Sequence, residues 1–179
     1  MAIGVVMHTF DVQLADLDRG VYEDLTLRLA QHPSETAEFM VTRLLAYCLE
    51  YTDGIAFSEG VAATNEPAVL VRDATGRQTA WIEVGSPDAE RLHYGSKLTG
   101  HVAIYTHRDP ARVVPQWSGK KIRDAENIVL HSFDPGFVQS VAEAVERRNT
   151  VTLSVTEGQL YLDVNGVNLT SGVRAHPVG

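Results

Sequence analysis

The chain has only one cysteine, Cys48, among its 179 residues. A lone cysteine excludes an internal disulfide framework and a thiolate metal cluster. No apolar run approaches the length needed to cross a membrane, and residues 1–10 lack the basic segment that begins a signal peptide. We therefore expect a cytoplasmic protein that is not embedded in a membrane.

Positive charge is also scarce. Lysine and arginine together number 15 against 23 acidic residues, which gives a formal net charge of −8. Proteins that wrap nucleic acid over a large surface normally carry an excess of positive charge, so this balance argues against that class. It leaves room for a metal-dependent phosphodiesterase, because the acids of such a site are counted in the same total.

The content of 44% hydrophobic and 21% charged residues is ordinary for a globular protein. The length suffices for one domain with its own core, and no linker, repeat or low-complexity segment interrupts it. We therefore predict a single domain over residues 1–179. Within that class, the composition favours a small enzyme or a scaffold.

Alternating apolar residues predict antiparallel strands at both ends of the chain. The predicted strands cover residues 2–14, 21–30, 150–156, 159–164 and 167–169. The first two form an N-terminal hairpin, and Glu157-Gly158 predicts a C-terminal hairpin between the next two. The tail from Gly172 is expected to be loose.

Two predicted helices lie between these strands. Ser34 is the expected N-cap of the first, which carries apolar residues at helical spacing as far as Cys48. Glu35 falls in its first turn, where the helix dipole favours an acid. The second predicted helix starts at Asp134 and runs to about Arg148.

The central stretch holds the candidate site. Residues 65–73 and 78–85 are apolar runs separated by turn residues, so they predict a hairpin. Glu66 begins the first strand and Glu83 lies near the end of the second, so the hairpin brings both acids to the same edge of the sheet. Glu83 lies inside an apolar strand, where an unpaired charge is costly.

A predicted helix follows directly, with Ser86 as its N-cap and Pro87 in its first position. Lys97 lies in its last turns, before a strand over residues 101–107 that we expect to run parallel to the strand holding Glu83. Two acids and a nearby cation suit a divalent metal and a phosphate. The alternative is that Glu66 and Lys97 are ordinary solvated residues.

Three motifs extend this interpretation to a family. They are His32-Pro33-Ser34-Glu35-Thr36, Asn65-Glu66-Pro67 and Trp81-Ile82-Glu83-Val84-Gly85-Ser86-Pro87-Asp88. In this order and spacing they closely resemble the YaeQ family of bacterial proteins, and the resemblance extends over essentially the whole chain. The predicted order helix, strand, strand, strand, helix, strand is similar to the core of the PD-(D/E)XK nuclease-like superfamily.

The resemblance implies an α/β (α+β) fold with a restriction-endonuclease-like core (αβββαβ) and a mixed sheet. It implies that Glu66 and Glu83 are the paired acids of the superfamily and that Glu35 is the acid on the first core helix. Gly85 stands where the superfamily usually has its lysine, and Lys97 on the next helix takes that place. Glu66 and Glu83, with the carbonyl of Val84, would then hold Mg²⁺ or Mn²⁺.

Further basic residues are candidates for contacting the substrate. Arg91 is placed to contact a phosphate oxygen, and the alternative is a surface pair with Asp88 or Glu90. Lys120 and Lys121 lie in a basic loop that is either a phosphate-contacting patch or a solvated connector.

Three functions follow from these observations. The first is a metal-dependent phosphodiesterase acting on nucleic acid, favoured by Glu66, Glu83 and Lys97. The second is a catalytically inactive nuclease-like scaffold that binds a protein or nucleic-acid partner, favoured by Gly85 and the acidic balance. The third is a flavodoxin-like binder of small molecules, which ranks last because no glycine-rich phosphate loop follows any predicted strand.

Overall fold

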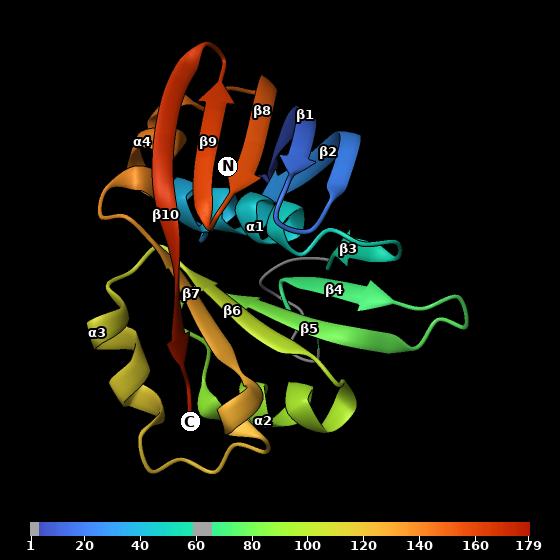
Figure 1. The fold of residues 1–179 in the computed structure, drawn as a ribbon, viewed down its shortest axis with the longest axis vertical. Helices are drawn as coiled ribbons and strands as arrows, with labels where there is room; N and C mark the ends of the chain where they lie inside the picture. The colour runs from blue at the N-terminus through green and yellow to red at the C-terminus, as the bar shows by residue number, and fades with distance from the viewer. Residues whose placement is uncertain (1–3, 59–65) are drawn as a thin grey trace. The chain divides into compact units, whose positions relative to one another are not determined.

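The computed structural model describes residues 4–58 and 66–179 (Figure 1). The chain divides into two compact units. Unit 1 comprises Met1–Leu44 and Phe133–Arg174, and unit 2 comprises Leu45–Ser132 and Ala175–Gly179. Strands and helices occur in both, which confirms the mixed α/β class, while the single-domain boundary 1–179 stays a prediction. None of the helices in the described residues is both long and apolar enough to cross a membrane.

Unit 1 is built on a sheet with the strand order β2-β1-β8-β9-β10. Its strands are β1 (Val6–Asp16), β2 (Val21–Gln31), β8 (Arg148–Thr156), β9 (Gln159–Val164) and β10 (Val167–Pro177). β1 runs parallel to β8, and the other neighbours in this sheet are antiparallel. Alternate residues such as Phe10, Val12 and Leu14 are buried, so one face of the sheet joins the core. The predicted terminal hairpins are confirmed.

The C-terminal part of unit 1 departs from the prediction in two places. The tail does not loosen at Gly172, because this residue pairs with Gln159 and β10 continues to Pro177. Helix α4 (Phe137–Ala144) stops short of Arg148, because that residue already begins β8. In both cases strand pairing decided the local structure.

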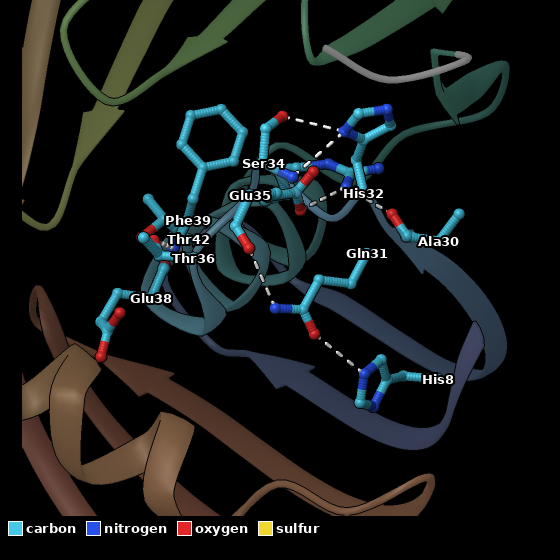
Figure 2. Close-up of polar contacts among 11 residues, drawn as sticks. His8, Ala30, Gln31, His32, Ser34, Glu35, Thr36, Glu38, Phe39 and Thr42 are labelled. Carbon is cyan, nitrogen blue, oxygen red and sulfur yellow. Dashed lines mark hydrogen bonds and ion pairs between the residues drawn. The ribbon is translucent and has the colours of Figure 1, made fainter. Parts of the chain in front are cut away.

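Helix α1 (Ala37–Leu49) begins later than predicted. The hydroxyl of Thr36 accepts a hydrogen bond from the backbone amide of Phe39 at 3.1 Å, so Thr36 is the N-cap. Ser34, the predicted N-cap, instead has its hydroxyl 2.8 Å from Nδ1 of His32 (Figure 2). The prediction chose the wrong one of two hydroxyl residues only two positions apart.

Unit 2 has a mixed sheet with the strand order β7-β6-β5-β4-β3. Its strands are β3 (Ile55–Phe57), β4 (Val69–Arg72), β5 (Gln78–Val84), β6 (Val102–Thr106) and β7 (Val129–Phe133). β3, β4 and β5 pair antiparallel, whereas β5, β6 and β7 are parallel, as predicted for β5 and β6. Its helical elements are α2 (Ala89–Leu98), α3 (Pro110–Val113), η1 (Val114–Trp117) and η2 (Ala125–Asn127). The order α1, β3, β4, β5, α2, β6 matches the predicted core, and its classification as restriction-endonuclease-like stays a prediction.

The N-cap of helix α2 lies two residues after the predicted one, Ser86. The residue before the helix is Asp88, and its side chain makes no capping hydrogen bond. The hydroxyl of Ser86 accepts from Nε2 of Gln116 at 2.6 Å, and the carbonyl of Pro87 accepts from Nε1 of Trp117 at 2.8 Å. Ser86 and Pro87 therefore anchor the entry to α2 against η1.

The core of unit 2 is packed around Trp81 of β5, which is fully buried. Its other buried members are Leu92, Val102, Ile104, Val113, Trp117, Ile128 and Leu130. Helix α2 lies directly against Trp81 because Gly95 has no side chain. A Cβ atom at this position would lie 2.5 Å from Cγ of Trp81, closer than packed atoms approach.

We predict that Gly95→Ala destabilises the protein by about 2 kcal/mol, because the added methyl overpacks the contact with Trp81. Urea unfolding measures the loss. The matched control is Gly100→Ala, where an added Cβ meets nothing within 4 Å. Equal stability of the two variants would contradict the packing described for Trp81.

Candidate functional site

Glu83 is a buried acid on β5, with 4% of its surface exposed. Its neighbours Ile82 and Val84 are also buried, and β5 pairs with β4 and β6, so the strand fixes the position of the carboxylate. Arg91, near the start of α2, supplies the partner. Its Nη2 donates to Oε1 of Glu83 at 2.9 Å and its Nε donates to Oε2 at 3.2 Å. This two-pronged geometry engages both carboxylate oxygens.

Arg91 also links Glu83 to the segment that precedes β4. Its Nη2 donates to the backbone carbonyl of Glu66 at 2.7 Å. The carboxylate of Glu66 instead lies 3.7 Å from Nη2 of Arg72, with 29% of the side chain exposed. The hairpin therefore brings Glu66 and Glu83 to one edge of the sheet, as predicted, although Asn65 of that motif lies outside the described residues.

Burial and mutual contact shift the pKa values of both Glu83 and Arg91. Burial raises the pKa of the Glu83 carboxyl, and the hydrogen bond and positive charge of Arg91 oppose this rise. In return, the hydrogen bond to Glu83 raises the pKa of the Arg91 guanidinium, which stays cationic. The guanidinium carbon also lies 6.0 Å from the centre of the Trp81 ring. Such a pair offsets its desolvation only while both partners are present.

This arrangement does not fit a resident Mg²⁺ or Mn²⁺ ion. These ions need several oxygen ligands, but both oxygens of Glu83 already accept hydrogen bonds from Arg91. Within residues 4–58 and 66–179, no group of three His, Cys, Asp or Glu side chains is placed to hold a metal. Metal binding by Glu66, Glu83 and the Val84 carbonyl stays a prediction, and it would require Arg91 to leave Glu83.

Lys97 lines a surface hollow that contains neither Glu66 nor Glu83. The hollow has a volume of about 380 Å³. Its lining residues are His93, Lys97, Lys121, Ile122 and Arg123, which we call the basic hollow. The structure thus gathers Lys97 with other basic residues in this hollow, and a site shared by Lys97, Glu66 and Glu83 stays a prediction.

Two hydrogen bonds hold the basic hollow in shape. The backbone amide of Arg123 donates to Nδ1 of His93 at 3.0 Å, and the hydroxyl of Ser96 donates to the Arg123 carbonyl at 2.6 Å. His93 and Ser96 are three residues apart and share one face of α2. The loop that carries Lys121 is therefore fastened to the helix that carries Lys97.

The charges of this loop are accessible to solvent. Lys120 and Lys121 are both exposed, and Lys120 adjoins the lining of the basic hollow in sequence. Nε of Arg123 lies 3.5 Å from Oδ2 of Asp124, and more than half of each side chain is exposed. Exposed pairs of this kind are weak, so Arg123 still contributes positive charge to the hollow.

Glu35, the third predicted acid, belongs to unit 1 and precedes α1 instead of lying in its first turn (Figure 2). Its side chain is 1% exposed, and Oε1 accepts from Nη1 of Arg43 at 2.8 Å. Its backbone carbonyl accepts from Nε2 of Gln31, whose Oε1 lies 3.1 Å from Nε2 of His8. These contacts anchor the start of α1, and a catalytic role for Glu35 stays a prediction.

Sequence reasoning did not assign Arg91 to Glu83 and did not select His93, and Arg123 entered only as the last residue of the predicted basic loop. A signal for the first existed, since an acid inside an apolar strand needs a cation and Arg91 follows on the next helix. His93 and Lys97 also stand four residues apart on one helix face. No local pattern indicated that the basic loop ending in Arg123 would lie against this helix.

Comparison with known proteins identifies the family. The family model described as YaeQ protein matches residues 1–172. The chain belongs to the YaeQ family. It is 31% identical over 177 residues to the uncharacterized protein YaeQ of Escherichia coli (strain K12), covering 98% of this chain and 97% of that one. It is 30% identical over 163 residues to the YaeQ protein of Salmonella typhi, covering 90% of each chain.

Solved structures share the fold of this YaeQ-family chain. The crystal structure of YaeQ protein from Pseudomonas syringae superposes with a TM-score of 0.84 at 30% identity, covering 96% of this chain and 95% of that one. The YaeQ protein from Xanthomonas axonopodis pv. citri gives a TM-score of 0.86 at 24% identity, covering 98% and 99%. The curated YaeQ relatives are named as uncharacterized, so an activity must be argued from the site.

We predict that Arg91→Met destabilises the protein by about 3 kcal/mol at pH 7, because it leaves the Glu83 carboxylate buried without its cation. The double variant Glu83→Gln/Arg91→Met should recover most of this loss. Urea unfolding of the two variants provides the comparison.

The difference in unfolding free energy between Arg91→Met and the double variant should depend on pH. The pKa of Glu83 is raised in the folded state, so the folded chain holds the proton more tightly than the unfolded chain. Stability therefore falls as the pH rises from the ordinary glutamate range through the raised pKa of Glu83. The stability of Arg91→Met should therefore approach that of the double variant at acid pH. A stability difference between the two variants that does not change with pH would contradict this account.

Proposed function

We propose that this YaeQ-family chain is a nuclease-like scaffold that binds nucleic acid through its phosphates at the basic hollow, without hydrolysing it. The observation that supports the proposal is the separation of charges in unit 2. At the sheet edge both oxygens of Glu83 are taken up by Arg91 and Glu66 lies 3.7 Å from Arg72, whereas Lys97 and Lys121 line an open surface.

The distribution of lysine is the first part of the argument. The chain has three lysines, Lys97, Lys120 and Lys121, against 23 acidic residues. Two of them line the basic hollow, and the third adjoins it in sequence. In a chain with a net charge of −8, such a local concentration of positive charge favours a local anionic ligand over broad wrapping of a polyanion.

The chemistry of the lining is the second part. Lysine ammonium groups act as point charges for phosphate, and the arginine guanidinium presents several N–H donors to its oxygens. Because Nδ1 of His93 accepts the Arg123 amide, a neutral His93 carries its proton on Nε2 and has a further donor. None of the described residues that line the hollow is an acid, so a phosphate there meets donors and cations.

Hydrolysis, the alternative function, would require a different arrangement of the side chains at the sheet edge that holds Glu66 and Glu83. A metal-dependent phosphodiesterase using Glu66 and Glu83 would need Arg91 to release both oxygens of Glu83. The loss of a buried pair costs several kcal/mol, which a metal ion would have to offset. The paired edge therefore supports binding without catalysis.

We predict that Lys97→Ala/Lys121→Ala weakens binding of a fluorescein-labelled 12-nucleotide DNA strand about tenfold, because two phosphate contacts are lost. It should also make the dependence of log affinity on log salt shallower by about 1.4. Fluorescence anisotropy at NaCl concentrations from about 50 to about 200 mM, a range that includes the physiological ionic strength, measures the affinity and its salt dependence.

The matched control is Arg77→Ala/Arg112→Ala, which removes the same charge from exposed positions outside the hollow. It should leave the affinity and the salt dependence nearly unchanged. Equal weakening by both double variants would reject the hollow as the binding site. Cleavage of the strand in Mg²⁺ that disappears in Glu83→Gln would reject binding without hydrolysis.

A further inference from the structure

We infer that the basic hollow selects single-stranded nucleic acid over a duplex, with an unpaired base stacked on Tyr94. This inference rests on the proposed function, because it takes phosphate binding at Lys97 and Lys121 as given. Beyond the proposed function, it specifies that the bound nucleic acid is single-stranded and that Tyr94 is the residue that selects it.

Tyr94 is a large aromatic side chain left on the surface, with 48% of its area exposed. It follows His93 directly on α2 and lies three residues before Lys97. Residues three and four apart are neighbours on a helix surface, so Tyr94, which does not itself line the hollow, is next to the lining residue Lys97. An aromatic ring therefore lies beside a set of phosphate-binding groups.

The ring of Tyr94 packs against the core of unit 2. It contacts Trp81 edge-on, with the ring centres 5.4 Å apart and the planes at 69°. Trp81 is fully buried, and Gly95 lets it lie directly under this part of α2. Tyr94 is thus supported by a fixed residue while nearly half of it faces solvent, so little conformational freedom is lost when a ligand stacks on it.

Leu98 enlarges the apolar surface beside this ring. It is 41% exposed and lies four residues after Tyr94 on the same helix. Cations that track phosphates, combined with aromatic rings on which bases stack, are the arrangement that binds single strands without sequence preference. In a duplex each base is already stacked and paired, so its face is not available to Tyr94.

The experiment uses the whole chain and compares a 12-nucleotide DNA strand, the corresponding duplex, and a strand of equal length made of abasic residues. We expect the base-bearing strand to bind about tenfold more tightly than either of the other two, which corresponds to one stacked base. Because the abasic strand carries the same phosphates, this comparison isolates stacking without altering the protein.

Variants of Tyr94 assign the stacking to its ring. Tyr94→Leu should weaken binding of the base-bearing strand about tenfold and leave its salt dependence unchanged, whereas Tyr94→Phe keeps the ring and should bind normally. Tyr161→Leu is the matched control, since Tyr161 is 52% exposed on β9 of unit 1. It should have no effect.

Each outcome bears on a separate claim. Equal affinity for the strand, the duplex and the abasic strand, with Lys97→Ala/Lys121→Ala still weakening all three, would overturn the inference and leave the proposed function standing. Unchanged binding by Tyr94→Leu would also overturn it. Failure of all three probes to bind would reject both the inference and the proposed function.

Discussion

The contact between Arg91 and Glu83 is the constraint on which the rest of unit 2 depends. One guanidinium donates to both oxygens of a buried carboxylate on β5 and to the carbonyl of Glu66. A helix, a strand and the segment before β4 are thereby joined through a single side chain. Because removal of Arg91 would leave the Glu83 carboxylate buried without this cation, the pair favours one position of α2 against the sheet.

The position of α2 in turn determines what its residues can do. Arg91 faces the sheet edge, Gly95 allows contact with Trp81, and His93 and Ser96 hold the backbone of Arg123. Short-range contacts of this helix thus account both for the sheet edge at which Arg91 pairs with Glu83 and for the open basic hollow. The two features have opposite chemistry because the acids have internal partners and the lysines face solvent.

Much of the fold of unit 2 follows from its sequence, because local patterns encode it. Apolar runs on either side of Asp73 and Gly76 predicted the hairpin of β4 and β5, and the helix that follows predicted β6 parallel to β5. The same hairpin correctly brought Glu66 and Glu83 to one edge. Helix boundaries were less predictable, since Thr36 and Ser34 are both good caps, and the structure differs between them only in which hydroxyl accepts from a helix amide and which lies against His32.

The chemistry of the site was less predictable than its location. The sequence shows that Glu83 needs a partner, but a metal ion and an arginine both satisfy that need, and only the geometry of α2 favours Arg91. Lys97 was placed with the acids because it follows them on the next helix. Its neighbours in space include Lys121 and Arg123, which come from a loop more than twenty residues later in the chain.

The most direct test of this account is the titration of the Glu83 carboxyl carbon by NMR in the ¹³C-labelled chain, assigned by its absence in Glu83→Gln. Burial predicts a pKa above the ordinary glutamate range, although Arg91 opposes the rise, and the occupation of both carboxylate oxygens by Arg91 predicts a titration curve that millimolar MgCl₂ leaves unchanged. An ordinary pKa that falls when Mg²⁺ is added would show that Glu83 is a metal ligand, and it would contradict the account.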